Sequence, residues 1–153
     1  MARVRPSKLK VAMDNAINTA QLSHDEETQV GSVLLKSDTM AVVATGYNGF
    51  VKGAPDHELP ATRPDKYQYM MHSEENLLTN CLKHGISTND CIVVCTLSPC
   101  THCMRLLWQA GIKQVVCKGK YRDFEDIMKM KDLSVLESTT PDGFILLEYG
   151  VKT

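Results

Sequence analysis

The sequence has no apolar run long enough to cross a membrane, and no apolar signal region follows its basic first residues, Met1 to Pro6. A membrane-spanning helix requires about 20 consecutive apolar residues, and a secretory signal requires an apolar core behind its basic start. Since the sequence shows neither, we expect a soluble intracellular protein of the cytoplasm, or of the host cytoplasm if the source is a virus.

The sequence also lacks an excess of positive charge. Its 17 Lys and Arg face 18 Asp and Glu, the formal net charge is −1, and no segment is a basic run. Proteins that bind long nucleic acids carry a basic patch or stripe. We therefore expect no long nucleic acid among the partners, unless folding assembles such a patch from separate segments.

Repeats and low-complexity segments are missing as well. What remains is a chain of 153 residues, 43% hydrophobic and 23% charged, which is an ordinary globular composition. A chain of this length can bury a core of its own. We predict a single domain over residues 1–153.

The six cysteines are numerous enough for three disulfides, but a chain with its own core does not need them. Four of them, Cys81, Cys91, Cys95 and Cys117, lie in apolar runs and are interpreted as small buried side chains. The other two belong to the segment Ser98-Pro99-Cys100-Thr101-His102-Cys103.

This segment follows Met71-His72-Ser73-Glu74 by a fixed interval, since Cys100 comes 28 positions after His72. The pattern His-x-Glu followed by Pro-Cys-x-x-Cys is the signature of zinc deaminases. Cys100 and Cys103, three apart, share one face of a helical turn and can reach one ion together with His72. Three protein ligands leave a fourth tetrahedral position open, as in catalytic zinc sites.

Glu74 is the predicted catalytic residue, a proton shuttle beside the metal. We expect it to take a proton from the attacking water, protonate N3 of a cytosine ring and then protonate the leaving amine. A Cys-x-x-Cys alone also fits a redox dithiol or half of a structural zinc site. The combination with His72 and Glu74 favours the catalytic interpretation.

Hydrophobic periodicity and turn residues predict helices near residues 8–22, 72–84, 100–110 and 124–131. Strands are predicted at 30–36, 40–47, 91–97, 112–118 and 143–149, the first two as a hairpin. This order predicts an α/β fold of three layers, α/β/α, with a mixed, largely parallel, five-stranded sheet. Both halves of the metal motif fall at helix starts on one sheet edge, where α/β proteins bind ligands.

Two connections invite a functional interpretation. Gly46-Tyr47-Asn48-Gly49 can bring backbone and an amide close to a ligand, although Asn-Gly is also a common plain turn. The long polar segment from Phe50 to Tyr69 leads into the metal motif and is predicted to be a lid or a subunit contact. His24 and His57 are interpreted as surface histidines.

From about Leu9 to Asp123 the chain resembles the deoxycytidylate (dCMP) deaminases of the cytidine deaminase superfamily. The matching strings are Gln29 to Gly31, Thr45 to Gly49, Lys66 to Asn76, Ser98 to Cys103, and Gln109 to Lys113. The resemblance implies a cytidine-deaminase-like fold and zinc-dependent hydrolysis of dCMP to dUMP and ammonia, which supplies thymidylate synthesis.

The resemblance also implies roles for substrate-binding residues. Asn48 contacts the sugar hydroxyl, the backbone carbonyl of Ser98 accepts from the exocyclic amine, and Tyr121 lies against the base or sugar. Arg122, a planar fork of donors, suits a phosphate. Family members are typically homohexamers, many of them activated by dCTP with Mg²⁺ and inhibited by dTTP.

Two departures and two alternatives accompany the resemblance. Ser73 replaces the usual alanine, and Phe50-Val51-Lys52-Gly53 lacks the proline usual in a segment where we expect effector contacts. No further Cys-His cluster offers a second, structural zinc site. One alternative is deamination of another cytosine or adenine substrate: a free nucleoside, dCTP, or a base in tRNA or single-stranded DNA. The other is a non-catalytic module, which an intact Glu74 disfavours.

Overall fold

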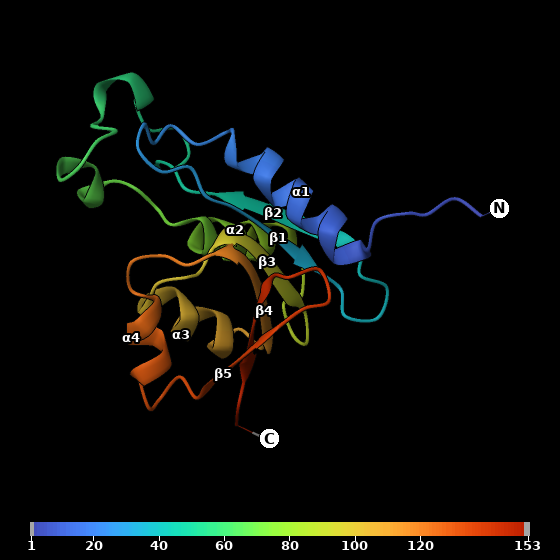
Figure 1. Ribbon diagram of the computed structural model, residues 1–153. Helices are drawn as coiled ribbons and strands as arrows, with labels where there is room; N and C mark the ends of the chain where they lie inside the picture. Colours follow the sequence, from blue (N-terminus) through green and yellow to red (C-terminus); the bar gives the residue numbers. More distant parts are fainter. Residues whose placement is uncertain (1, 152–153) are drawn as a thin grey trace.

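The computed structural model describes residues 2–151. A central sheet of six strands has the order β2-β1-β3-β4-β6-β5 (Figure 1). The strands are β1 (Gly31–Leu35), β2 (Val42–Tyr47), β3 (Ile92–Leu97), β4 (Gln114–Gly119), β5 (Val135–Thr139) and β6 (Ile145–Tyr149).

Two sequence-based expectations about this sheet are wrong. The prediction of five strands missed β5, an edge strand whose last four residues, Leu136 to Thr139, are exposed. An edge strand without a buried face gives no alternation of apolar and polar residues to detect. The sheet is also not largely parallel, because only β3 and β4 pair in parallel and every other neighbouring pair is antiparallel.

Four helices cover the two faces of the sheet and confirm the three-layer α/β/α prediction (Figure 1). Helix α1 (Lys8–Ala20) lies on one face, while α2 (Ser73–His84), α3 (Thr101–Gln109) and α4 (Phe124–Lys129) lie on the other. Helices α1 and α4 each end two residues earlier than predicted.

Strand alternation divides the core between these two faces. In β3, Ile92 and Val94 point to the α1 side, whereas Val93 and Cys95 point to α2 and α3. Successive side chains of a strand point to opposite faces, so one buried strand serves both layers. The four cysteines predicted to be small core residues are all buried free thiols, as expected: Cys81, Cys91, Cys95 and Cys117.

Two glycines allow helices to approach the sheet closely. A Cβ on Gly31 would lie 1.9 Å from the carbonyl oxygen of Ala16 in α1. A Cβ on Gly46 would lie 2.6 Å from the backbone of Ser73 and Leu77 in α2. Gly46 therefore lets the start of α2 pack closely against the end of β2. The close approach that this glycine allows is to a helix and not to a ligand.

The segment between β2 and α2 contains two short 3₁₀ turns, Asp56–Glu58 and Asp65–Gln68. It projects beyond the sheet edge at which α2 and α3 begin (Figure 1). Among residues 2–151, no helix has the length and apolar character needed to span a membrane.

Candidate active site

His72, Cys100 and Cys103 converge at the starts of two helices, as the motif predicts. His72 is the N-cap residue of α2 and Cys100 is the N-cap residue of α3. The Nδ1 atom of His72 lies 3.4 Å from Sγ of Cys100 and 3.3 Å from Sγ of Cys103. The three donor atoms all lie within 4.8 Å of one another.

The chemistry of these donors fits a zinc ion. One imidazole nitrogen and two sulfurs are ligands that Zn²⁺ prefers, and three protein ligands are typical of catalytic zinc. A hydrogen bond from the Cys103 thiol, with His72 nearby, lowers the pKa of Cys100 to about 4. The Cys100 thiolate in turn raises the pKa of Cys103. Two thiolates at this spacing require a cation between them, which a divalent metal provides.

Short-range hydrogen bonds orient the two helix starts. The backbone N–H of His72 donates to Oε1 of Glu75 at 2.9 Å, and the N–H of Cys103 approaches Sγ of Cys100 at 3.4 Å. These contacts use N–H groups of the first helical turns, which have no partner within the helix. The same positions thus cap the helices and present the donors.

Ser73, which replaces the usual alanine, anchors α2 to the sheet. Its side chain is buried, with Oγ 2.7 Å from Oγ of Ser32 and donating to the carbonyl of Gly46 at 3.1 Å. A buried hydroxyl is tolerated where it is hydrogen-bonded. The serine therefore fits this position by bonding to β1 and β2.

Glu74 follows one residue later and is only 4% exposed. Burial raises the pKa of its carboxyl to about 7, against the opposing effect of nearby His72. A carboxyl with a pKa near neutral pH can both accept and donate a proton. The structure thus places an acid–base group beside the metal donors, where the motif predicted it.

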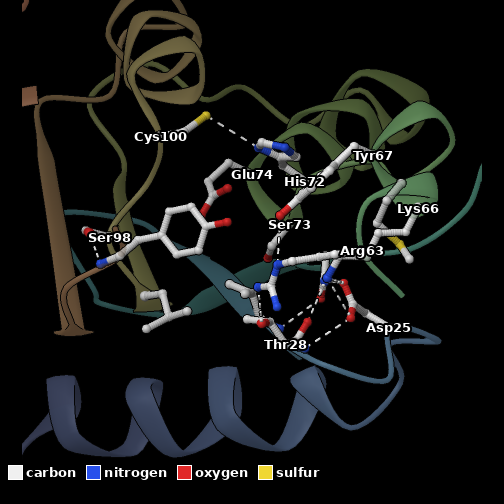
Figure 2. Close-up of a pocket in the computed structure, with 15 residues that line it drawn as sticks. Asp25, Thr28, Arg63, Lys66, Tyr67, His72, Ser73, Glu74, Ser98 and Cys100 are labelled. Atoms are coloured by element: carbon white, nitrogen blue, oxygen red, sulfur yellow. Dashed lines mark hydrogen bonds and ion pairs between the residues drawn. The ribbon is translucent and has the colours of Figure 1, made fainter. Parts of the chain in front are cut away.

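A cavity of about 590 Å³, part of it open to solvent, begins at this site. Polar and charged side chains converge with a few apolar ones on this cavity, as in binding sites for small molecules. Figure 2 shows Cys100 and His72 at one end and Arg63, Asp25 and Thr28 at the other, with Glu74 in the wall. The apolar part of the lining comes from Val30, Met70 and Leu97.

The end of the cavity away from the metal donors contains a buried ion pair. Nζ of Lys66 lies 2.7 and 3.0 Å from the two carboxylate oxygens of Asp25, and both side chains are less than 5% exposed. Burial alone would raise the pKa of Asp25, but Lys66 and the N–H groups of Thr28 and Glu27 outweigh it and lower the pKa. The pair joins the loop after α1 to the segment before α2.

Asn48 lies beside this pair and lines the cavity. Its Oδ1 accepts from the N–H of Val30 at 2.8 Å, and its Nδ2 donates to the carbonyl of Thr28 at 2.8 Å. An amide has two lone pairs and two N–H donors, so one lone pair remains for a ligand. The structure holds this side chain in a fixed orientation at the cavity wall.

Two of the other three predicted substrate-binding residues also line the cavity. Ser98 and Tyr121 line the cavity, and Oγ of Ser98 accepts from the N–H of Tyr121 at 2.7 Å. Arg122 is not part of the lining, but its Nη1 donates to the hydroxyl of Tyr67, a lining residue, at 3.1 Å. His24 is exposed and stacks on Phe50, with Nε2 3.3 Å from Asp56, outside the lining.

Sequence reasoning missed the contribution of Asp25, Thr28, Arg63 and Lys66 to this cavity. Asp25 and Thr28 read as polar loop residues, and Arg63 lies in a segment without a motif. Lys66 belongs to a string shared with the dCMP deaminases, which was the one available signal. Their proximity depends on contacts between segments about 40 positions apart, such as Asp25 with Lys66.

Comparison with known proteins agrees with the geometry. The family profile described as "Cytidine and deoxycytidylate deaminase zinc-binding region" matches residues 6–118. The deoxycytidylate deaminases of Pongo abelii and Homo sapiens are each 34% identical to this chain over 137 residues, which cover 85% of this chain and 75% of each relative.

Solved structures show the same fold. The dCMP deaminase from the cyanophage S-TIM5, in complex with dCMP and dUMP, is 28% identical with a TM-score of 0.71, and the match covers 86% of this chain and 95% of that one. A tRNA:A34 deaminase at 18% identity, with a TM-score of 0.52 and coverage of 75% and 79%, shares the fold alone.

A zinc ion on one histidine and two cysteines, with a buried glutamate beside it, defines a zinc-dependent deaminase. The chain belongs to the cytidine and deoxycytidylate deaminase family, and within it to the dCMP deaminases. His72, Cys100 and Cys103 are its zinc ligands.

Proposed function

We propose that this protein deaminates dCMP to dUMP and ammonia and so supplies dUMP for thymidylate synthesis. The observation that carries the proposal is a single cavity in which His72, Cys100 and Glu74 at one end are continuous with Asn48 and Tyr121. The relatives with matching sequences are deoxycytidylate deaminases, which supports dCMP as the occupant of that cavity.

In this mechanism, zinc held by His72, Cys100 and Cys103 would act as a Lewis acid and let water act as a nucleophile near neutral pH. Glu74 accepts a proton from that water and donates it to N3 of the pyrimidine, which makes C4 more electrophilic. After attack at C4, Glu74 takes the remaining proton from the new hydroxyl on C4 and transfers it to the amine. One water is consumed, the C4–N bond breaks, and ammonia leaves. Burial of Glu74 suits both steps because it places the pKa near 7.

The substrate-binding residues position the ring for this chemistry. We assign Asn48 to the sugar hydroxyl, since its amide is fixed by Val30 and Thr28 with one lone pair left over. The backbone carbonyl of Ser98 would accept a hydrogen bond from the exocyclic amine. Tyr121 would lie against the base or sugar. Arg122, which donates to the hydroxyl of the lining residue Tyr67, would contact the phosphate. Holding reactants in register supplies much of the rate enhancement in such reactions.

The deciding experiment measures ammonia release from dCMP, deoxycytidine, cytidine, dCTP and a short single-stranded oligonucleotide. We expect dCMP to have the highest kcat/KM. A higher value for the oligonucleotide would support a base in DNA or RNA as the substrate, and the absence of ammonia from every compound would favour a non-catalytic module.

The homohexamer and the response to nucleotide effectors also belong to this proposal. Light scattering of the purified protein tests the first. Rate measurements with dCTP and Mg²⁺, and separately with dTTP, test the second. The unusual segment Phe50-Val51-Lys52-Gly53 makes the effector response the feature in which this chain can differ most from its relatives.

A further inference from the structure

Two connections of the chain are hydrogen-bonded to each other beside the metal donors. The first leads from β3 to α3 and ends at Cys100, and the second leads from β4 to α4. The N–H of Ser98 donates to the carbonyl of Gly119, at the end of β4, at 2.9 Å, and the N–H of Tyr121 donates to Oγ of Ser98 at 2.7 Å. Ser98 and Tyr121 line the cavity, so these bonds join its wall to the segment that carries a metal donor.

Asp123 extends this contact to the start of α3. Its Oδ2 atom accepts a hydrogen bond from the N–H of Thr101 at 3.4 Å. Thr101 is the first residue of α3 and directly follows Cys100. The first N–H groups of a helix have no acceptor within that helix, and the helix dipole favours a carboxylate beside them. Asp123 thus supplies, from a separate segment, an acceptor that α3 lacks.

The side chain of Asp123 does not cap its own helix. Asp123 is the N-cap residue of α4, and aspartate is one of the residues that most often cap a helix start through the side chain. The backbone carbonyl of Asp123 accepts from the N–H groups of Asp126 and Ile127, at 3.0 and 3.2 Å, but the side chain makes no capping hydrogen bond to α4. The carboxylate is therefore directed at α3 and away from the helix that it precedes.

This orientation leaves one carboxylate oxygen without a partner. Oδ1 of Asp123 is buried and, within residues 2–151, accepts no hydrogen bond. Most buried polar atoms of folded proteins are hydrogen-bonded, and a buried acceptor without a partner costs stability. A residue that only stabilised the fold would not be expected to keep a buried oxygen in this state.

Different contacts hold the two ends of α3. Helices α3 and α4 lie side by side (Figure 1). In the second half of α3, Nε of Arg105 donates to Oδ2 of Asp132 at 2.7 Å, and Nε1 of Trp108 donates to the carbonyl of Leu133 at 2.8 Å. Both acceptors follow α4 in the chain. The metal donors lie at the other end of α3, where the contact with Asp123 has the corresponding place.

We propose that Asp123 is a positioning residue for the metal site. Through the N–H of Thr101 it holds the first turn of α3, with both cysteine donors, in register with the connection that carries Tyr121. The metal donors and the cavity wall then form one unit. The affinity for the metal depends on a residue that neither belongs to the three donors nor lines the cavity. This role does not depend on which substrate is deaminated.

The first test measures metal affinity with Co²⁺, which binds nitrogen and sulfur donors and reports thiolate ligation through an ultraviolet charge-transfer band. Asp123→Ala should weaken Co²⁺ binding about 10-fold, the lower end of the effect of losing an outer hydrogen-bond partner of a metal ligand. Asp123→Asn keeps an oxygen acceptor for the N–H of Thr101 and should restore most of that affinity. Parental affinity in Asp123→Ala would overturn the proposal, and so would an Asp123→Asn protein as weak as Asp123→Ala.

Removing the donor gives a second, independent variant. Proline is tolerated at the first position of a helix, and Cys100 before it already has the extended φ of −72° and ψ of 170° that proline requires of its neighbour. Thr101→Pro should therefore weaken Co²⁺ at least as much as Asp123→Ala. In the Asp123→Ala background it should have little further effect, because the bond is already absent. Additive losses would contradict the coupling between the two residues.

A matched control separates the metal site from a general effect on α4. Asp126→Ala makes the same substitution at an exposed position of the first turn of α4 and should leave the Co²⁺ affinity unchanged. Urea unfolding, followed by the fluorescence of the single tryptophan, Trp108, shows whether each metal-free variant is folded. Should Asp123→Ala fail to fold without metal, Thr101→Pro compared with Asp123→Asn provides the test.

None of these measurements requires turnover, so the positioning role and the proposed function can fail separately. If the Co²⁺ affinities follow the expected pattern while the zinc-loaded parent releases no ammonia from dCMP, the positioning role stands and the proposed function fails. If the parent deaminates dCMP while Asp123→Ala binds Co²⁺ as the parent does, the proposed function stands and the positioning role fails.

Discussion

The two ends of the cavity are built by different means. At the metal end, short spacings place His72 with Glu74 at the start of α2 and Cys100 with Cys103 at the start of α3, and the packing of the two helices brings these pairs together. At the other end, Asp25, Arg63 and Lys66 come from irregular segments that only tertiary contacts hold together. The metal end has few ways to rearrange, whereas the loop end can vary in sequence and in the ligand group it recognises.

This difference predicts that variants at the metal end abolish chemistry or metal binding, while variants at the loop end change stability and substrate preference.

The largest effect is expected for Glu74→Gln. Removing the acid–base group should lower kcat by several orders of magnitude, because general acid–base catalysis alone contributes about 10²- to 10⁴-fold. Zinc content, measured by inductively coupled plasma mass spectrometry, should stay at the parental level. Glu26→Gln, an exposed carboxylate outside the cavity lining, is the control. A Glu74→Gln enzyme with parental turnover would remove Glu74 from the mechanism.

Cys103→Ala should separate the zinc ligands from the core cysteines. Loss of a direct ligand should weaken zinc binding by more than the roughly 10- to 100-fold seen for outer hydrogen-bond partners. Competition with a chromogenic chelator measures that affinity. Cys91→Ala, at a buried thiol away from the site, should keep zinc and lose stability instead. Equal zinc loss in both variants would contradict the assignment.

Lys66→Met tests the loop end. It leaves the buried Asp25 carboxylate without its cation, and breaking a buried pair in this way costs about 3–5 kcal/mol in the free energy of unfolding. Urea denaturation measures the loss, and zinc affinity should change little. Lys113, whose pair with Asp90 is exposed at 3.5 Å, gives the control: Lys113→Met should cost at most about 1 kcal/mol. Comparable losses in the two variants would show that the buried pair has no special role.

The smallest effect is the acid sensitivity of the same pair. The pKa of Asp25 is lowered in the folded chain below its usual 3.8. A group with a depressed pKa stabilises the fold above its unfolded pKa, and that contribution disappears as the pH falls through the folded pKa. The difference in unfolding free energy between the parent and Asp25→Asn should therefore be largest near neutral pH and shrink below pH 3.8. Acid release of zinc affects both proteins alike and cancels in the difference. A constant difference down to about pH 2 would contradict the lowered pKa.

Much of the fold could be predicted from the sequence, because most helices and strands have strong local sequence signals. Helix α2 ends at Gly85, which adopts a left-handed φ of 66° as a helix stop should, and β3 is a continuous apolar run. Strand β5 has no such signal, because four of its five side chains are exposed and the strand pairs only with β6. Local sequence could not predict whether neighbouring strands run parallel or antiparallel, since this depends on where β3 inserts beside β1.

The sequence by itself identified the zinc ligands, the glutamate beside them and the four helices, because each half of the metal motif and each helix has a local pattern that spans a few residues. Tertiary structure decided that Asp25 pairs with Lys66, that Asn48 is held by the loop after α1, and that Arg63 meets Arg122 at Tyr67. Those contacts join segments about 20 to 60 positions apart through irregular backbone, where no periodicity records which residues will meet. Local sequence patterns therefore identify the residues of the metal site, whereas the packing of the loops sets the shape of the rest of the cavity.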